Sequence, residues 1–351
     1  MTRLLEILVA IIIVCVLAVV FAIFLPAHRH IERSVEVSSP ARQIYDVVDG
    51  FRTFPSWNAL RAFDPRVQLT YNDVAQGAGA KVNWTSDDKR IGNGNYTISS
   101  NPEPKQDSQV TWDVVNPWRG ENKHFTIDIV PATNGKTSRI TMGYDVDFGW
   151  DLYGRYTGMY LDGNPATQIQ FQLGALQTML ATFPNIDYTT QQIDLKDVEK
   201  RPTIFVSTTA KRTLDDVADA TDKAMQALQA QVKKDKINVT GARITITTNF
   251  GDENYDFDMA LPIDKDDYQV QDPVKIGAIG GGKELVTTFT GSAAQLPAMR
   301  LVLKAYAYTH GYVFDESSEG PGRFYEETTS DPNAPDDQQT YIVHLPLQQA
   351  Q

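Results

Sequence analysis

Glu326 is the residue whose type and surroundings most directly suggest binding chemistry. A carboxylate buried among aromatic rings is costly unless a cation or a hydrogen-bond donor meets it, and aromatic faces themselves attract cations. The neighbouring Tyr325, together with Tyr255 and Phe257 from an earlier strand-like stretch, could form an aromatic wall around this carboxylate. These four residues predict a pocket that would hold a cationic small molecule.

Two other interpretations of Glu326 stay open. On an exposed edge strand it would only pair with Arg323 in solvent. In an enzyme, a buried Glu326 could serve as a general base. Because side chains alternate along a strand, Glu327 points away from Glu326, and only one of the two can enter a pocket.

Three tryptophans in the first half of the chain, Trp57, Trp84 and Trp112, are candidates for the wall of a second ligand pocket. A tryptophan on a sheet that curls round a helix more often belongs to the core, and we favour the core for any one of them. No general acid–base pair stands out here, and we assign no catalytic residue.

Several function classes are disfavoured by composition. The five histidines are scattered, and no Cys/His cluster occurs, so we expect neither a metal site nor a cofactor. The run Gly280–Gly282 lacks the strand–turn–helix context of a phosphate-binding loop. A net charge of −12 argues against nucleic acid as a partner, because phosphate binding needs a basic surface.

The longest apolar stretch is Ile7–Leu25, which contains no charged residue. As a helix it would extend about 28 Å, close to the ~30 Å hydrocarbon core of a bilayer. A cleaved secretory signal is the alternative, but the stretch exceeds the usual ~7–15 apolar residues and no Ala-x-Ala site follows. We therefore predict a single-pass anchor in residues 1–30 that contacts the lipid bilayer through residues 7–25. We favour soluble domains on the periplasmic, extracytoplasmic side.

The next segment, residues 31–190, has the pattern of an α+β domain. Ile31–Val37 alternates as a strand, and Ser39-Pro40 precedes a predicted helix over Ala41–Val48. Another helix is predicted over Pro165–Thr182. Between these helices lie six strand-like runs divided by turn residues: Val67–Asn72, Ala80–Ser86, Gly92–Asn101, Ser108–Val115, Lys123–Pro131 and Ser138–Val146. A sheet wrapped on a helix can leave a cavity for apolar ligands.

The last predicted domain, residues 201–348, follows a polar link at Gln191–Lys200 and contains an internal repeat. Each copy has the order β-α-β-β. The first copy comprises Thr203–Thr208, Thr213–Val232, Ala242–Asn249 and Asn254–Pro262. The second comprises Glu284–Thr290, Pro297–His310, Gly322–Thr329 and Thr340–Pro346. Two such units usually pair about a pseudo-twofold axis, and the cleft between them is the natural ligand site.

At Val35–Val48 (VEVSSPARQIYDVV) and Phe54–Asn58 (FPSWN) the first domain resembles the START-like polyketide cyclase/SRPBCC superfamily. The resemblance covers the whole domain. It implies a helix-grip fold, an antiparallel sheet with a long C-terminal helix, around a hydrophobic pocket. Members of this superfamily bind lipids, transfer them, cyclise polyketides or only sense, so no single reaction is implied.

The second domain resembles the GyrI-like, or AraC-type effector-binding, domain. Four stretches carry the resemblance in order: residues 255–262 (YDFDMALP), 289–297 (FTGSAAQLP), 324–332 (FYEETTSDP) and 341–346 (YIVHLP). In that family a Glu beside an aromatic residue lies in a pocket for cationic or polar-aromatic ligands, and Glu326 after Tyr325 matches it. Such domains often follow a DNA-binding helix-turn-helix, whereas here the START-like domain and the anchor precede it.

These features predict a membrane-anchored protein that binds or senses a hydrophobic, amphiphilic or cationic small molecule without clear catalytic residues. The alternative is an enzyme acting on a small organic substrate, either polyketide cyclase-like or a GyrI-like hydrolase with Glu326 as general base. A third interpretation is an envelope protein whose domains bind a protein partner.

Overall fold

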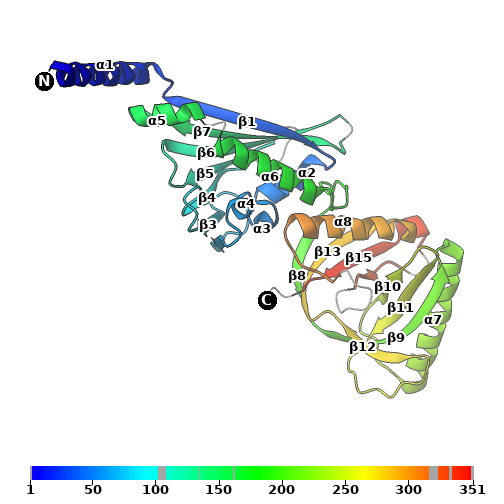
Figure 1. Cartoon of the computed structure of the whole chain (residues 1–351). Coiled ribbons are helices and arrows are strands. Elements are labelled where there is room, and N and C mark those ends of the chain that lie inside the picture. The colour runs from blue at the N-terminus through cyan, green and yellow to red at the C-terminus, as the bar shows by residue number, and fades with distance from the viewer. Residues whose placement is uncertain are drawn as a thin grey trace. The chain divides into compact units, whose positions relative to one another are not determined.

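The computed structural model describes residues 2–101, 108–133, 135–160, 163–315, 323–331 and 334–348. The chain divides into two compact units, unit 1 (Met1–Asp187) and unit 2 (Tyr188–Gln351). Each unit has its own sheet, and every described strand pair is antiparallel (Figure 1). The α+β class and the N-terminal apolar helix expected from the sequence are confirmed.

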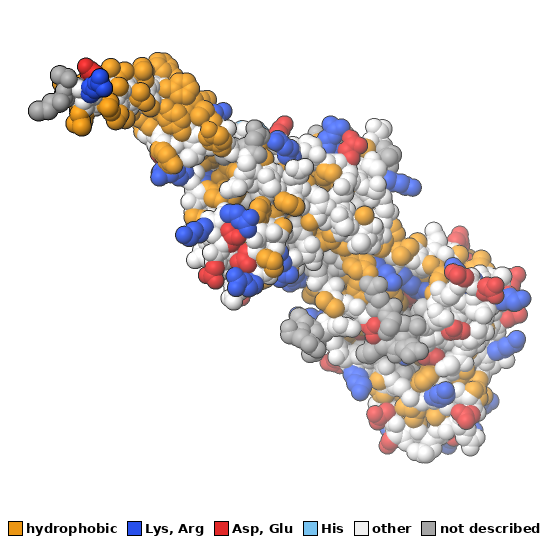
Figure 2. All heavy atoms as spheres, in the orientation of Figure 1, with side chains coloured by type: hydrophobic (Ala, Val, Ile, Leu, Met, Phe, Trp, Pro, Cys, Tyr) orange, Lys and Arg blue, Asp and Glu red, His pale blue; other side chains and the backbone are white. Residues whose placement is uncertain are grey.

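Helix α1 (Thr2–Phe24) contains the apolar stretch. Its residues Arg3–Phe24 are long and apolar enough to cross a membrane. Most of its large hydrophobic side chains are exposed, and the space-filling view shows them as a continuous orange rod (Figure 2). A membrane anchor and a secretory signal sequence both meet these criteria of length and composition.

Unit 1 is a seven-stranded sheet in the order β1-β7-β6-β5-β4-β3-β2. The strands are β1 (His28–Val37), β2 (Gln68–Tyr71), β3 (Lys81–Thr85), β4 (Gly94–Ser100), β5 (Ser108–Val115), β6 (Glu121–Pro131) and β7 (Ser138–Asp147). The helices that follow α1 are α2 (Ala41–Val48), α3 (Phe54–Trp57), α4 (Leu60–Phe63), α5 (Leu152–Thr157), η1 (Gly158–Tyr160) and α6 (Asn164–Leu180). Helix α6 packs against β1, β7 and α3.

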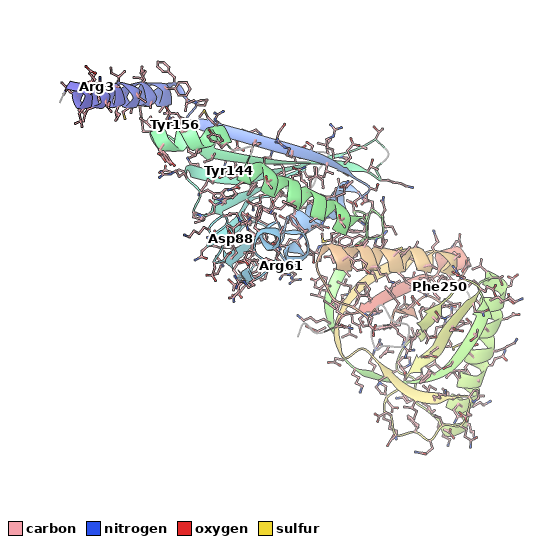
Figure 3. All side chains as sticks on the ribbon, viewed as in Figure 1. Arg3, Arg61, Asp88, Tyr144, Tyr156 and Phe250 are labelled. Atoms are coloured by element: carbon pink, nitrogen blue, oxygen red, sulfur yellow. The ribbon has the colours of Figure 1, made fainter. Side chains whose placement is uncertain are left out.

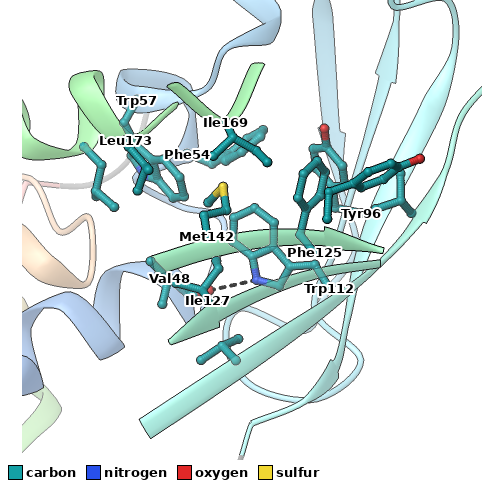
Figure 4. Close-up of a cluster of buried hydrophobic side chains, with 14 of the residues drawn as sticks. Val48, Phe54, Trp57, Tyr96, Trp112, Phe125, Ile127, Met142, Ile169 and Leu173 are labelled. Atoms are coloured by element: carbon teal, nitrogen blue, oxygen red, sulfur yellow. Dashed lines mark hydrogen bonds between the residues drawn. The ribbon is translucent and has the colours of Figure 1, made fainter. Parts of the chain in front are cut away.

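The core of unit 1 lies between this sheet and the helices α2, α3 and α6. Because side chains alternate along β5, Val110, Trp112 and Val114 all point into the core. The buried ring of Trp112 lies 5.7 Å from that of Trp57, and its Nε1 donates a hydrogen bond of 3.1 Å to the Val48 carbonyl (Figure 4). These contacts join the sheet to α2 and α3.

Unit 2 is an eight-stranded sheet in the order β12-β9-β11-β10-β14-β15-β13-β8. The strands are β8 (Ile193–Val198), β9 (Arg201–Lys211), β10 (Arg243–Phe250), β11 (Asn254–Pro262), β12 (Lys275–Ile279), β13 (Gly282–Thr290), β14 (Tyr325–Thr328) and β15 (Thr340–Pro346). Its helices are α7 (Leu214–Asp235), η2 (Ala293–Gln295), α8 (Leu296–Thr309) and η3 (Asp336–Gln338). The strand order β9-β11-β10 of the first copy is mirrored by the strand order β14-β15-β13 of the second copy. The two copies meet where β10 pairs with β14.

Two edge strands of unit 2 differ from the expectation. Part of the predicted link Gln191–Lys200 is strand β8, which pairs with β13, and β12 was not predicted. Both are short, and β8 carries several charges, a pattern that protects exposed sheet edges but resembles a polar loop. Residue 322, the predicted start of the third strand of the second copy, lies outside the described residues.

Candidate ligand-binding site

A cavity of about 350 Å³ lies in unit 2, where residues from both β-α-β-β copies meet. This volume falls within the range of about 300–1,000 Å³ that is usual for small-molecule sites. Its wall residues come from β10, β11, β14, β15, η2 and the beginnings of α7 and α8: Arg212, Thr213, Leu214, Val217, Thr221, Arg243, Thr245, Phe250, Tyr255, Phe257, Met259, Ala293, Ala294, Leu296, Pro297, Arg300, Glu326, Thr328 and Tyr341.

The two helices that begin at this cavity have specific starting signals. The Thr213 side chain accepts a hydrogen bond from the Asp216 amide and caps α7. On the other side, Ser292 and Gln295 form a reciprocal capping box at η2, which leads directly into α8. The amide ends of both helices, each equivalent to a partial positive charge, therefore lie at the cavity.

The aromatic wall of the cavity comes from β11. Tyr255 and Phe257 are buried, and their rings stack with centroids 4.7 Å apart. Phe250, labelled in Figure 3, extends this surface with its ring 5.2 Å from that of Tyr255. The structure thus brings Tyr255 and Phe257 to one cavity with Glu326, as the sequence predicted.

Glu326 lies in this cavity but already has an internal cation. It is 1% exposed, and its Oε1 accepts a hydrogen bond of 2.7 Å from Nε of Arg300 on α8. Arg300 also donates to the Tyr255 hydroxyl at 3.2 Å. The second carboxylate oxygen, Oε2, is buried without a hydrogen-bond partner among the described residues. The alternative pairing of Glu326 with Arg323 is wrong, because Arg323 instead lies 3.7 Å from Asp258.

Arg300 was not predicted from the sequence. Its helix, LPAMRLVLKAYAYT, carries two cations four residues apart, Arg300 and Lys304, in an otherwise uncharged sequence, and this pattern does not show which of the two is buried. Burial alone would lower the pKa of Arg300, but the Glu326 carboxylate and Tyr255 outweigh it and raise that pKa. For the Tyr255 hydroxyl, burial has the opposite effect and raises the pKa, so this hydroxyl stays protonated at neutral pH. The pair Arg300–Glu326 is a fixed, charged part of the wall.

Positive charge exceeds negative charge around the cavity. Among the described residues that line it, three are arginines, Arg212, Arg243 and Arg300, and one, Glu326, carries a carboxylate. Arg212 donates a hydrogen bond of 3.1 Å to the Gly251 carbonyl, and its guanidinium lies 4.0 Å from the ring centroid of Phe250. Arg243 makes no ion pair with any described residue. The beginning of α8 adds to the positive potential because its first turn has no acidic residue, whereas Asp215 and Asp216 offset the positive end of α7. The cavity is therefore suited to an anionic or electron-rich group.

Tyr325 does not belong to this cavity, and its predicted place in the aromatic wall is corrected. Adjacent residues of a strand face opposite sides of the sheet, so Tyr325 cannot share a side with Glu326. Its hydroxyl donates to Glu284 Oε2 at 2.6 Å, and its ring stacks on His344 with centroids 4.2 Å apart. On the same side, Glu327 pairs with Arg201.

The three tryptophans proposed for a second pocket are packed in the core of unit 1. Trp57 and Trp112 are fully buried against each other and against Phe54 (Figure 4). Trp84 is buried too, with its ring 4.6 Å from that of Tyr96. All of these rings contact other protein rings, so the structure supports the core interpretation.

No protein-family model matches the sequence, and no curated protein matches it. Among solved structures, a hydrolase from Listeria innocua is similar at 12% identity over 45% of this chain and 92% of that chain, with a TM-score of 0.35. Norcoclaurine synthase from Thalictrum flavum is similar at 12% identity over 45% of this chain and 90% of that chain, with a TM-score of 0.35. The C-terminal domain of EcmrR is similar at 11% identity over 46% of this chain and 99% of that chain, with a TM-score of 0.39. Similarity at this level identifies the function of neither unit.

Proposed function

We propose that the protein is a membrane-anchored small-molecule binding protein whose binding site is the cavity of unit 2. The observation that carries the proposal is the combination of an aromatic wall, Tyr255 and Phe257, with a buried Arg300–Glu326 pair in one cavity of about 350 Å³. Buried polar groups of this kind are costly unless they are satisfied. Glu326 Oε2 has no hydrogen-bond partner among the described residues, and a ligand hydroxyl or N–H, separate from any anionic group of the ligand, would donate to it.

The charge balance favours a ligand with an aromatic body and an anionic group. A cation was expected while Glu326 was considered alone, but Arg300 already neutralises that carboxylate. An added cation would instead face Arg243 and the amide end of α8, whose first turn has no acidic residue. An anion would pair with Arg243, whose guanidinium offers the planar fork that suits carboxylates.

Binding is favoured over catalysis by the chemistry of the wall. The described residues that line the cavity include no histidine, cysteine, serine or lysine, and the Tyr255 hydroxyl, which shares Arg300 with Glu326, is already held by Arg300 and Thr247. General-base catalysis by Glu326 Oε2 is the second candidate, because that oxygen is unpartnered. A Glu326→Gln variant separates the two, since it would abolish turnover while retaining the binding of an aromatic anion.

The anchor and its sidedness complete the proposal. We assign α1 to the membrane as an uncleaved single span, with both units on the extracytoplasmic side. Protease treatment of spheroplasts, in which the cytoplasmic membrane is intact and the periplasmic side is accessible, tests the side: units outside that membrane are digested without lysis. An intact mass that includes residues 1–25 tests retention of the helix.

The ligand class is testable with three probes that share one bicyclic ring: naphthoate, naphthalenemethanol and naphthylmethylammonium. In calorimetric titrations of the full chain in detergent, the binding affinity should decrease from naphthoate to naphthalenemethanol to naphthylmethylammonium. Arg243→Gln should remove most of the preference for the anion. The matched control is Lys196→Gln, an exposed cation on β8 that lies outside the cavity.

A further inference from the structure

The short helix α5 is attached to the end of α1. Arg155 of α5 donates hydrogen bonds to the Ile23 carbonyl at 2.8 Å and the Leu25 carbonyl at 3.2 Å. The Tyr156 hydroxyl donates to the Ala18 carbonyl at 2.6 Å (Tyr156 is labelled in Figure 3). Carbonyls in the last turn of a helix have no partner within that helix, and Arg155 satisfies them. These hydrogen bonds hold the C-terminal end of α1 against α5 of unit 1.

The segment that follows β7, which includes α5, exposes large aromatic side chains. Trp150 is 78% exposed, Tyr153 64% and Tyr160 73%, and Met159 is exposed beside them. The guanidinium of Arg155 lies 5.6 Å from the Trp150 ring centroid, and that of Arg119 lies 4.6 Å from the ring of Tyr153. Tryptophan and tyrosine with nearby cations are typical of the membrane–water interface, where one part of each ring is apolar and the other is wet.

A polar groove of about 440 Å³ lies between η1 and the first strand after α1. Arg29 and Arg33, two residues on the same side of β1, line it together with Gly158 and Met159. The Arg29 Nε is buried and has no hydrogen-bond partner among the described residues. A Cβ at Gly158 would lie 3.2 Å from Arg29 Cγ, so glycine there leaves room for the arginine stem.

The charges around the groove suit an anion. Among the described lining residues there is one carboxylate, Glu32, which lies 3.4 Å from His30 Nε2, against the two guanidinium groups of Arg29 and Arg33. Figure 2 shows blue Lys and Arg side chains where the orange helix joins unit 1. This local positive charge contrasts with the net charge of −12 of the whole chain.

We propose that residues 148–160 and the Arg29–Arg33 groove form a lipid-contact surface, in which the exposed aromatic side chains enter the bilayer interface and the groove binds the phosphate of an anionic lipid headgroup. The surface is continuous with α1, which supplies the reason for a lipid as occupant. The groove begins only a few residues after the span ends, at the depth of the headgroups. The inference rests on retention of α1 in the membrane, which is part of the proposed function.

The first test is tryptophan quenching in the full chain reconstituted into phosphatidylcholine vesicles. Of the five tryptophans, Trp57, Trp84 and Trp112 are buried and Trp150 is the most exposed, so lipid-borne quenchers report chiefly on Trp150. A nitroxide near the headgroup should quench this emission more than a nitroxide deep in the acyl chain. Trp150→Phe should remove at least half of the quenchable emission. Quenching of Trp150 by aqueous iodide but not by the shallow nitroxide overturns the proposal, and a protein partner or a second copy then becomes the occupant.

The second test is native mass spectrometry of the full chain released from vesicles of equal parts phosphatidylcholine and phosphatidylglycerol. Wild type should retain phosphatidylglycerol over phosphatidylcholine, and Arg29→Gln should reduce the retained phosphatidylglycerol at least threefold. Arg61→Gln, on α4 away from α1 in unit 1, is the matched control (Figure 3). Equal retention of phosphatidylglycerol by wild type and Arg29→Gln overturns the headgroup site.

The same mass spectra separate this inference from the proposed function. A mature chain without residues 1–25 would refute both the anchor and the lipid-contact surface. A chain that retains them, binds naphthoate and shows no lipid quenching of Trp150 would refute the lipid-contact surface alone.

Discussion

Replacement of Arg300 by methionine is the sharpest perturbation of unit 2. The substitution keeps an unbranched side chain of similar length but leaves Glu326, 1% exposed, with a buried and uncompensated charge. Two unit charges about 4 Å apart attract by roughly 4 kcal/mol at an effective dielectric constant of about 20. Breaking a buried pair by removing one partner typically costs about 3–5 kcal/mol. We expect Arg300→Met to lower the free energy of unfolding of unit 2 by about 3–5 kcal/mol.

The second site distinguishes a charge effect from a packing effect. In the double variant Arg300→Met/Glu326→Gln no charge is left buried, so most of the loss should be recovered. The coupling energy between the two sites should then be about 2 kcal/mol or more. A packing effect alone would leave the double variant as unstable as the sum of the single variants.

The assay must resolve the two units. All five tryptophans lie between residues 57 and 150, so tryptophan fluorescence in urea follows unit 1 only and should not change. Hydrogen exchange measured by mass spectrometry on peptides from β10 and β14 follows unit 2. If Arg300→Met costs less than about 1 kcal/mol and adds independently to Glu326→Gln, the buried pair does not have the role assigned to it.

Two further predictions concern unit 1 and α7. Burial, with the nearby Asp46 carboxylate, raises the pKa of Asp49 to about 7, so the folded state holds a proton that the unfolded state releases near pH 4. Unit 1 should therefore lose stability as pH rises from about 4 to 7, and Asp49→Asn, which stays neutral, should be more stable than wild type at pH 8 but not at pH 4 in tryptophan-monitored urea titrations. Thr213→Ala removes the cap of α7 and should cost unit 2 about 1 kcal/mol by hydrogen exchange, whereas the neighbouring exposed Leu214→Ala should cost less.

Much of the fold follows from local patterns. The predicted runs in residues 31–190 correspond to β1–β7, α2 and α6, because most of these strands have one buried face and alternate in the sequence, whereas β2 is largely exposed. Helices α3, α4 and α5 were not predicted, since four to six residues are too few to show a helical period. The repeat in unit 2 was visible because both copies keep the order β-α-β-β.

The site was only partly predictable, for two physical reasons. The partner of Glu326 lies 26 positions earlier, on a helix whose rotation about its axis is set by tertiary packing. Without Arg300 the carboxylate indicated a cationic ligand, and with it the charge balance reverses. The error at Tyr325 was avoidable, because the pleat of a strand separates it from Glu326 as surely as it separates Glu327.

Calorimetric titration of naphthoate against naphthylmethylammonium tests the central claim most directly, because the two probes share one ring system and carry opposite charges. For wild type and Lys196→Gln we predict at least tenfold tighter binding of the anion, and for Arg243→Gln a preference for the anion that is reduced several-fold. Equal binding of both probes, tighter binding of the cation, or a preference that survives Arg243→Gln unchanged would contradict the assignment of the unit 2 cavity as a site for aromatic anions.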